Sequence, residues 1–351
     1  MKALVYHGAG QKSWEEVADP VIEKPTDVIV KMTATTICGS DLHILKGDVP
    51  TVPEGRVLGH EGVGVITEIG SAVSDLMVGD RVLISCISSC GKCSYCRAGT
   101  YSHCLGDEGV SGLGWLLGHL VHGTQAEYVR IPYAETSLHK LPDSISDAEA
   151  VILSDIIPTG HEMGALNGKV AAGDVIAVIG VGPVGLATIT ASQLYGPSRV
   201  IAIDLDANRL EQSLEFGATD TVLASAKDWK ERVMAMTDGL GVDVSIEAVG
   251  IPSTLQMAFD IVRPGGTVAN VGVHGAPMTL HMEDLWIANI DVTMGLVNTN
   301  TTPTLLKMVE QHKLDVGRFV SHTYQLGEIE EAYDVFARAS ETKALKILLT
   351  N

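Results

Sequence analysis

The sequence predicts an α/β protein in which a doubly wound parallel sheet is joined to a β-rich, barrel-like domain. An apolar, β-branched run at Val175–Ile179 has the length of a buried parallel strand and leads directly into a glycine-rich turn. Strand and helix patterns then alternate as far as Val273. Before this run, short strands punctuated by glycine replace the alternation, which is typical of a compact barrel.

The composition limits the class of protein. A chain of 351 residues, 46% of them hydrophobic and 19% charged, is long enough for two domains with separate cores. Its net charge of −19 argues against a nucleic-acid or anionic-membrane surface. The first residues turn polar after Tyr6, and no stretch approaches the ~20 apolar residues of a membrane span. We therefore expect a cytoplasmic protein.

The elements before Val175 follow from local patterns. Alternating or apolar runs predict strands at residues 2–5, 27–33, 81–85 and 124–131, and helical patterns follow at residues 148–154 and 159–171. Residues 108–123 are glycine-rich and are expected to form a loop. His119 and His122 lie in that loop at a helical spacing that its glycines oppose, so we do not expect them to bind zinc.

Four of the six cysteines form a cluster within 15 residues of sequence: Cys90, Cys93, Cys96 and Cys104. Each two-residue gap lets a turn present neighbouring sulfurs to one ion, so the four thiolates can close a tetrahedral zinc site. Four protein ligands leave no open position, which makes the expected site structural. Four free thiols in a polar loop and an iron–sulfur cluster are the alternatives. The rest of the chain carries no electron-transfer motif to support the cluster.

The turn after Val175–Ile179 has the spacing G-x-G-x-x-G and predicts a dinucleotide site. Gly180 allows the tight turn, Gly182 lets the backbone approach a pyrophosphate, and Gly185 lets helix and strand pack closely. The expected contacts include the intervening residues Pro183 and Val184 and, further along, Val273. A second strand from Arg199 ends at Asp204, about 20 residues on, where a carboxylate accepts ribose hydroxyls. Asp204 favours NAD over NADP, although Arg209 lies close enough to accept a 2′-phosphate.

The alternation continues after Asp204. Helices are predicted at residues 207–216, 226–236 and 253–262, and strands at residues 221–223, 242–246 and 267–273. Two later helices are expected at residues 302–311 and 329–339. The final apolar run, residues 344–349, is strand-like and is expected to return to the first domain.

Residues that can bind a catalytic metal are scattered, and spacing alone does not join them. Taken singly, Cys38 is a buried cysteine, His60 a loop histidine and Asp155 a carboxylate at a helix end. The pairs His60-Glu61 and His161-Glu162 lack the H-E-x-x-H pattern, so a zinc-protease site is excluded. Cys86 stands apart and is expected to be an ordinary buried thiol.

Over its full length the chain resembles the zinc-containing medium-chain alcohol dehydrogenases. The resemblance rests on six pieces in order: residues 38–43 (CGSDLH), 59–64 (GHEGVG), 79–82 (GDRV), the cluster at residues 90–104, residues 154–160 (SDIIPTG) and residues 180–185. It implies a GroES-like catalytic domain made of residues 1–155 and 296–351. A Rossmann domain of residues 156–295 lies between them in sequence, with the active site in the cleft.

The resemblance also implies the roles of individual residues. Cys38, His60 and Asp155 would hold a catalytic zinc, with Glu61 as an additional or exchangeable ligand. An aspartate as third protein ligand resembles the bacterial secondary-alcohol branch of the family. Zinc would polarise the alcohol oxygen while hydride passes to the nicotinamide.

A proton relay and a substrate pocket follow from the same resemblance. The Ser40 hydroxyl would lie beside the substrate oxygen, and His43 would receive the proton through the cofactor ribose. Thr159 would lie near the nicotinamide, and Trp115 and Leu296 would form walls of the pocket. Residues 279–294 resemble the segment through which members of the family pair, so we expect a homodimer or homotetramer.

The predicted activity is therefore NAD-dependent oxidation of secondary alcohols to ketones, or of alcohols to aldehydes, and the reverse reduction. We expect two zinc ions per chain and a small-molecule alcohol or ketone substrate. A sister enzyme acting on polyols, threonine or formaldehyde is the nearest alternative. A zinc-ribbon binding protein is disfavoured by the charge and the dinucleotide motif, and a relative that only binds nucleotide would be expected to lack the metal ligands.

Overall fold

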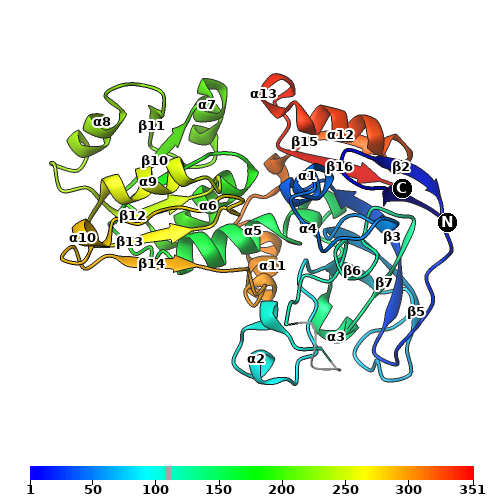
Figure 1. Cartoon of the computed structure of the whole chain (residues 1–351). Coiled ribbons are helices and arrows are strands. Elements are labelled where there is room, and N and C mark those ends of the chain that lie inside the picture. The colour runs from blue at the N-terminus through cyan, green and yellow to red at the C-terminus, as the bar shows by residue number, and fades with distance from the viewer. Residues whose placement is uncertain (107–111) are drawn as a thin grey trace. The chain divides into compact units, whose positions relative to one another are not determined.

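The computed structural model describes residues 1–106 and 112–351. This part of the chain forms two compact units, one of Met1–Asp155 with Asn298–Asn351 and one of Ile156–Val297 (Figure 1). Within the described residues, no helix combines the length and the apolar character needed to cross a membrane. The predicted glycine-rich loop at residues 108–123 falls partly outside the described residues.

The unit of residues 156–297 is built on a parallel sheet of six strands in the order β11-β10-β9-β12-β13-β14. The central strand β9 (Val175–Ile179) is buried nearly throughout because helices cover both faces of the sheet, which explains its unbroken apolar sequence. The other strands are β10 (Arg199–Asp204), β11 (Asp220–Leu223), β12 (Val242–Glu247), β13 (Val262–Asn270) and β14 (Asp291–Met294). The predicted doubly wound sheet is confirmed.

Helices connect these strands: α6 (Pro183–Ser192), α7 (Ala207–Glu215), α8 (Trp229–Ala235), α9 (Pro252–Ile261) and α10 (Met282–Leu285). The helix predicted over residues 159–171 is confirmed only in part, because the helical segment begins at Ile156, ends at Leu166 and is mostly a π-helix. The chain forms a single turn, α5 (Ile156–Thr159), and then a π-helix over Gly160–Leu166. Gly160 and Gly164 allow this segment to pack directly on Thr188 of α6, and a Cβ atom at either glycine would overlap Thr188. Close packing on α6 therefore accompanies the wider helical turn.

The unit of residues 1–155 and 298–351 contains two sheets. Strands β2 (Lys12–Glu16), β1 (Lys2–Tyr6) and β4 (Arg56–Val57) form the smaller one. The larger has the order β15-β16-β3-β5-β6-β8, with β7 (Tyr128–Ile131) also paired to β3 (Val28–Thr36). Its remaining strands are β5 (Gly62–Ile69), β6 (Arg81–Ile84), β8 (Leu138–Lys140), β15 (Val320–Gln325) and β16 (Lys346–Thr350). The predicted β-rich domain is confirmed.

The strand predicted at residues 124–131 is half as long as expected. Only Tyr128–Ile131 forms β7, because the preceding residues bond to loops instead of to one neighbouring strand. The amides of Thr124 and Gln125 donate to the carbonyls of Gly59 and Leu58, and the Leu4 amide donates to the Gln125 carbonyl. This arrangement holds Gln125 beside the segment that carries His60.

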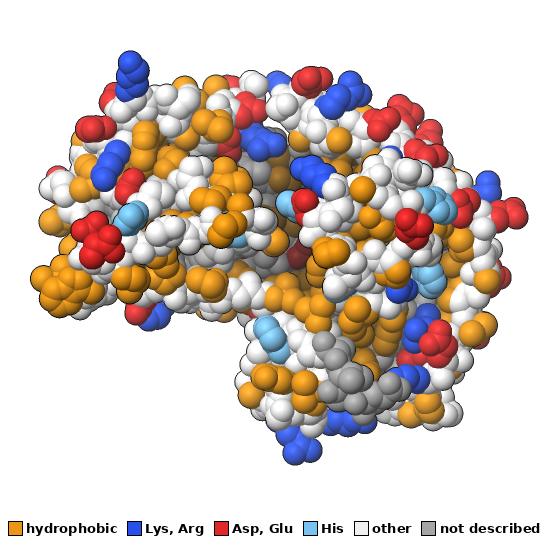
Figure 2. All heavy atoms as spheres, viewed as in Figure 1, with side chains coloured by type: hydrophobic (Ala, Val, Ile, Leu, Met, Phe, Trp, Pro, Cys, Tyr) orange, Lys and Arg blue, Asp and Glu red, His pale blue; other side chains and the backbone are white. Residues whose placement is uncertain are grey.

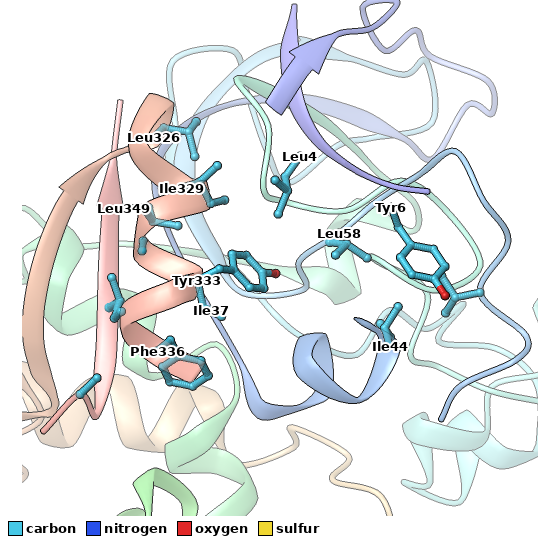
Figure 3. Close-up of a cluster of buried hydrophobic side chains, with 14 residues drawn as sticks. Leu4, Tyr6, Ile37, Ile44, Leu58, Leu326, Ile329, Tyr333, Phe336 and Leu349 are labelled. Atoms are coloured by element: carbon cyan, nitrogen blue, oxygen red, sulfur yellow. The ribbon is translucent and has the colours of Figure 1, made fainter. Parts of the chain in front are cut away.

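The helices of this unit are α1 (Gly39–Lys46), α2 (Ser94–Arg97), α3 (Ala134–Ser137), α4 (Asp147–Ile152), α11 (Thr302–Glu310), α12 (Ile329–Ala337) and α13 (Ala339–Thr342). Helix α12 buries Ile329, Tyr333 and Phe336 along one face, as an amphipathic helix does. Those side chains meet Leu4, Ile37 and other residues from the start of the chain in one apolar cluster (Figure 3). The C-terminal run forms a strand of the first domain, as predicted, and this strand, β16, pairs antiparallel with β3. The two ends of the chain therefore share one core.

Candidate functional site

Four potential metal ligands come together at the ends of separate elements. Cys38 caps the N-terminus of α1, His60 and Glu61 directly precede β5, and Asp155 follows α4. One donor atom from each of the four residues lies within 4.8 Å of the others. The Cys38 sulfur and the His60 Nε2 atom are each 3.4 Å from Asp155 Oδ2.

The donor set fits zinc. Ligand atoms about 2.0–2.3 Å from a tetrahedral zinc lie roughly 3.3–3.8 Å from one another. The distances from Asp155 Oδ2 to the Cys38 sulfur and to His60 Nε2 fall in that range. Burial raises the pKa of the Cys38 thiol, and the nearby charges of Asp155 and Glu61 raise it further. A divalent cation would relieve that repulsion and favour the thiolate.

The Glu61 carboxylate forms an ion pair with the ammonium group of Lys346. Its carboxylate oxygens lie 2.8 and 2.5 Å from the Lys346 ammonium, and the Thr36 hydroxyl donates to the same carboxylate. Both charged side chains are 1% exposed. Burial lowers the pKa of Lys346, but the charges of Glu61, Cys38 and Asp155 and the hydrogen bond with Glu61 together raise it by more. The Glu61 carboxylate is thereby engaged by Lys346, and the other candidate ligands of the group are Cys38, His60 and Asp155.

His60 is enclosed by acidic groups. Burial lowers its pKa, but hydrogen bonds with Asp155 and Cys38 raise it by more, so that it stands well above the usual value. On the other side of the ring, Nδ1 lies 4.0 Å from Asp41 Oδ1. A carboxylate behind a metal-binding histidine sets which nitrogen carries the proton.

Ser40 and His43, which are predicted for proton transfer, both lie on α1, the helix that Cys38 caps. The Ser40 hydroxyl is 3.5 Å from His60 Nε2. His43, one turn further along α1, is half-exposed and its Nδ1 atom is 2.9 Å from Asp48 Oδ2. Thr159 ends α5 in the other unit, and Leu296 lies in that unit too, just after β14. Trp115 packs edge-on to His60, with ring centroids 6.0 Å apart.

The predicted cysteine cluster also comes together. The sulfurs of Cys90, Cys93, Cys96 and Cys104 lie within 4.8 Å of one another, and all four are free thiols. The amides of Cys96 and Cys90 donate to the sulfurs of Cys93 and Cys104, respectively. Backbone hydrogen bonds lower the pKa of Cys93, which favours its thiolate. This arrangement fits a closed tetrahedral zinc site.

The histidines of the neighbouring loop take other partners. His119 Nε2 lies 2.6 Å from the Thr51 hydroxyl, and the Val57 amide donates to His122 Nδ1. Neither belongs to a metal-ligand group in the described part of the chain.

Replacing Cys96 by serine is expected to remove one zinc per chain and to lower the thermal midpoint. The remaining three ligands bind zinc less tightly, and a structural zinc contributes directly to folding free energy. Metal analysis and thermal unfolding test this result, with the separate buried thiol variant Cys86→Ser as control. Unchanged zinc content in Cys96→Ser would contradict the cluster's role.

The glycine-rich turn has the geometry that a dinucleotide needs. Gly180 has a φ of 85°, and a Cβ at Gly185 would overlap the Gly180 carbonyl oxygen. A Cβ at Gly182 would meet only Arg209, 3.8 Å away, so the space in front of this residue is open. Pro183 and Val184 begin α6, whose N-terminal amides face the same turn.

Two more of the predicted nucleotide residues lie at the carboxyl edge of the sheet. Asp204 ends β10, and its carboxylate accepts hydrogen bonds from the amides of Val181 and Asp206. The side chain is thereby oriented at the glycine-rich turn. Val273 lies beyond the end of β13 and is 73% exposed.

Sequence reasoning did not single out several residues of the metal site. Asp41 belongs to the quoted CGSDLH piece, yet nothing in the pattern marked it as the carboxylate behind His60. Lys346 was visible only as a lysine inside the apolar C-terminal run, and nothing there indicated its ion pair with Glu61. Gln125 and Tyr333 carried no signal, although both reach this region.

Comparison with known proteins agrees with this architecture. The family model of the alcohol dehydrogenase GroES-like domain matches residues 24–143, and that of the zinc-binding dehydrogenases matches residues 183–311. An alcohol dehydrogenase from Cupriavidus necator is 36% identical, over 96% of this chain and 95% of its own.

Solved structures are similar as well. Zinc-dependent alcohol dehydrogenase 2 from Streptococcus pneumonia, in its apo form, is 48% identical with a TM-score of 0.95, covering 100% of this chain and 98% of that one. The alcohol dehydrogenase TADH from Thermus sp. ATN1 is 36% identical with a TM-score of 0.91, covering 100% and 99%. The chain therefore belongs to the zinc-containing medium-chain alcohol dehydrogenases, enzymes that interconvert alcohols with aldehydes or ketones.

Proposed function

We propose that this enzyme oxidises secondary alcohols to ketones with NAD, holding one catalytic and one structural zinc per chain. The observation that carries the proposal is the convergence of Cys38, His60 and Asp155, with Glu61 held by Lys346. Three protein ligands would leave one position for the substrate oxygen. Zinc, when bound there, supplies Lewis-acid polarisation of that oxygen.

The residues around the ligands supply the proton path. Ser40 lies within 3.5 Å of His60 Nε2 and would accept the proton that the alcohol loses. His43, oriented by its contact with Asp48, would receive the proton next and pass it to solvent. Thr159 would hold the nicotinamide ring, onto which the hydride passes. Trp115 supplies an apolar wall beside His60, and Leu296 stays a predicted pocket residue.

Asp204 supports NAD as the cofactor. Its carboxylate, oriented by two amides, would accept the ribose hydroxyls and repel a 2′-phosphate. Arg209 lies close to Gly182 and would contact the phosphates that the glycine-rich turn receives.

An exposed apolar surface supports an oligomer. It comprises α10 and the edge strand β14, with Leu280, Met282, Trp286, Ile287, Val292 and Met294 exposed. Hydrophobic side chains gather at the α10 end in Figure 2. Because β14 pairs only with β13, its free edge would accept the same strand of a second copy, giving a dimer or a tetramer of two dimers. The six free thiols support a reducing, cytoplasmic location.

The function is tested by zinc analysis together with cofactor oxidation. We expect two zinc ions per chain, faster oxidation of NADH with acetone or 2-butanone than with acetaldehyde, and a strong preference for NADH over NADPH. One zinc per chain and no turnover would support a zinc site at the cysteine cluster and contradict the catalytic site. Faster turnover of sorbitol, threonine or a formaldehyde adduct than of 2-propanol would instead support the alternative, a sister enzyme acting on polyols, threonine or formaldehyde. Equal efficiency with both cofactors would contradict the role of Asp204.

A further inference from the structure

A line of buried polar side chains leads from the C-terminal helix α12 to His60. Its members are Tyr333, Gln125, Asp41 and His60, with exposures of 2%, 0%, 1% and 4%. Tyr333 projects from α12 into the apolar cluster, and its hydroxyl points away from the helix (Figure 3). Burying polar groups this deep in a core costs folding free energy unless they form hydrogen bonds, so the hydrogen-bond partners of these side chains indicate their role.

The hydrogen bonds run in one direction along this line. The Tyr333 hydroxyl donates to Gln125 Oε1 at 2.8 Å. Gln125 Nε2 donates to Asp41 Oδ2 and to the Thr36 carbonyl, each at 3.1 Å. The Asp41 carboxylate and the Thr36 carbonyl only accept, so they set which end of the amide carries the NH₂ group, and the Tyr333 hydroxyl holds the amide from its oxygen end.

Asp41 is in turn held from two sides. Its Oδ2 atom accepts from the Cys38 amide at 2.9 Å as well as from Gln125. Its other oxygen faces His60 Nδ1 at 4.0 Å, and neither of these two buried atoms has a hydrogen-bond partner among the described residues. A small approach would join them in a charge-assisted bond. The proton would then stay on Nδ1, leaving Nε2 to face Asp155 and Ser40.

We propose that Tyr333 is a positioning residue of the metal site, acting through Gln125 and Asp41 on the orientation and proton of His60. This inference rests on the proposed function, since it requires a metal ion at Cys38, His60 and Asp155. Loss of the tyrosine hydroxyl removes the donor to Gln125 Oε1, so the amide that donates to Asp41 is held by one hydrogen bond fewer. Mutating a residue that contacts a metal ligand typically lowers metal affinity 10–100-fold. Tyr333 is two hydrogen bonds further from His60 than such a residue, so we expect a change near the lower end of that range.

The same cluster contains a matched control. Tyr6 is another buried tyrosine of this cluster, but its hydroxyl has no hydrogen bond within the described structure (Figure 3). Tyr333→Phe and Tyr6→Phe make the same chemical change in the same core, and only the first breaks the polar line. A purely structural role for Tyr333 would affect folding stability and leave the metal site unchanged.

The experiment measures metal release and cobalt spectra in the full-length protein. In Tyr333→Phe we expect one of the two zinc ions to transfer to a chelator roughly tenfold faster than in the parent, and the visible bands of Co²⁺ bound in its place to shift. Tyr6→Phe should match the parent in both. Gln125→Met should reproduce the Tyr333→Phe spectrum, and the double variant should add little because the residues act in series.

The outcomes separate this inference from the function on which it rests. A parent that binds only one metal ion would contradict the catalytic site itself. A parent with two ions, and a Tyr333→Phe variant with the parent's release rate and cobalt spectrum, would overturn the positioning role alone. Equal changes in Tyr333→Phe and Tyr6→Phe would overturn it too, since they would trace the effect to core packing.

Discussion

Replacing Cys38 by serine is expected to lower kcat/KM for alcohol oxidation about a thousandfold, whereas Cys86→Ser stays within a few fold of the parent. Both thiols are buried beside Asp155, the first 3.4 Å from Oδ2 and the second 3.8 Å from Oδ1. Only Cys38 belongs to the ligand group. A serine hydroxyl binds zinc poorly, and losing about 4 kcal/mol of charge stabilisation corresponds to roughly three decades in rate.

Steady-state kinetics and zinc analysis of both variants measure this difference. Cys38→Ser should lose one zinc per chain, and Cys86→Ser should keep both. The Cys86 variant also reports what a buried hydroxyl in place of a thiol does to this core. Comparable losses of activity and metal in the two variants would contradict the assignment of Cys38 as a ligand.

Local sequence patterns predicted the elements on which the nucleotide site depends. The run Val175–Ile179 is apolar because both of its faces are covered. Gly180 is required locally by its φ of 85°, although a Cβ there would also meet Val249 from a distant part of the chain. A Cβ at Gly185 would overlap the Gly180 carbonyl oxygen, so the constrained residue and the residue that constrains it both belong to the G-x-G-x-x-G motif. Such short-range requirements leave a clear mark on a sequence.

The metal site could be predicted only through resemblance to a family. Cys38, His60 and Asp155 are brought together by the pairing of β3 with β5 and by the packing of α4, and no local pattern encodes those contacts. The line from Tyr333 to Asp41 was not predicted at all. Its first bond joins residues 208 positions apart, and tyrosine and glutamine each have many ordinary roles in a fold.

The errors in secondary structure have the same origin. Residues 159–171 carry a helical pattern, but residues 160–166 form a π-helix that packs closely on α6 through Gly160 and Gly164. Residues 124–127 look like the start of a strand, yet they bond to the loop around Gly59 and carry Gln125 toward the metal ligands. In both places, a tertiary contact outweighed the local preference.

Replacing Lys346 by methionine is expected to destabilise the metal-free protein by about 3–5 kcal/mol, because it leaves the buried Glu61 charge with only the Thr36 hydroxyl as a partner. Urea unfolding measures the change. Exposed Lys307 on α11 provides the control, since Lys307→Met should stay within about 0.5 kcal/mol of the parent. In the zinc-loaded protein the loss should be smaller, because Glu61 can then turn toward the metal.

The loss of folding stability in Lys346→Met should also depend on pH. Burial raises the pKa of Glu61 and the charge of Lys346 lowers it, so removing the lysine raises that pKa further. A carboxyl whose pKa is higher in the folded than in the unfolded state is stable as the neutral acid at low pH and loses stability as the pH rises. The pKa of Glu61 is about 7 in the parent, so above about pH 7 Glu61 ionises in the parent but stays protonated in Lys346→Met, and the deficit should grow as the pH rises above about 7.

A double variant, Glu61→Gln with Lys346→Met, tests whether the charge is responsible. Because it removes both members of the pair, it should recover most of the lost stability and the pH dependence should disappear. A double variant that is as unstable as Lys346→Met at every pH would instead assign the loss to the packing of the buried lysine side chain.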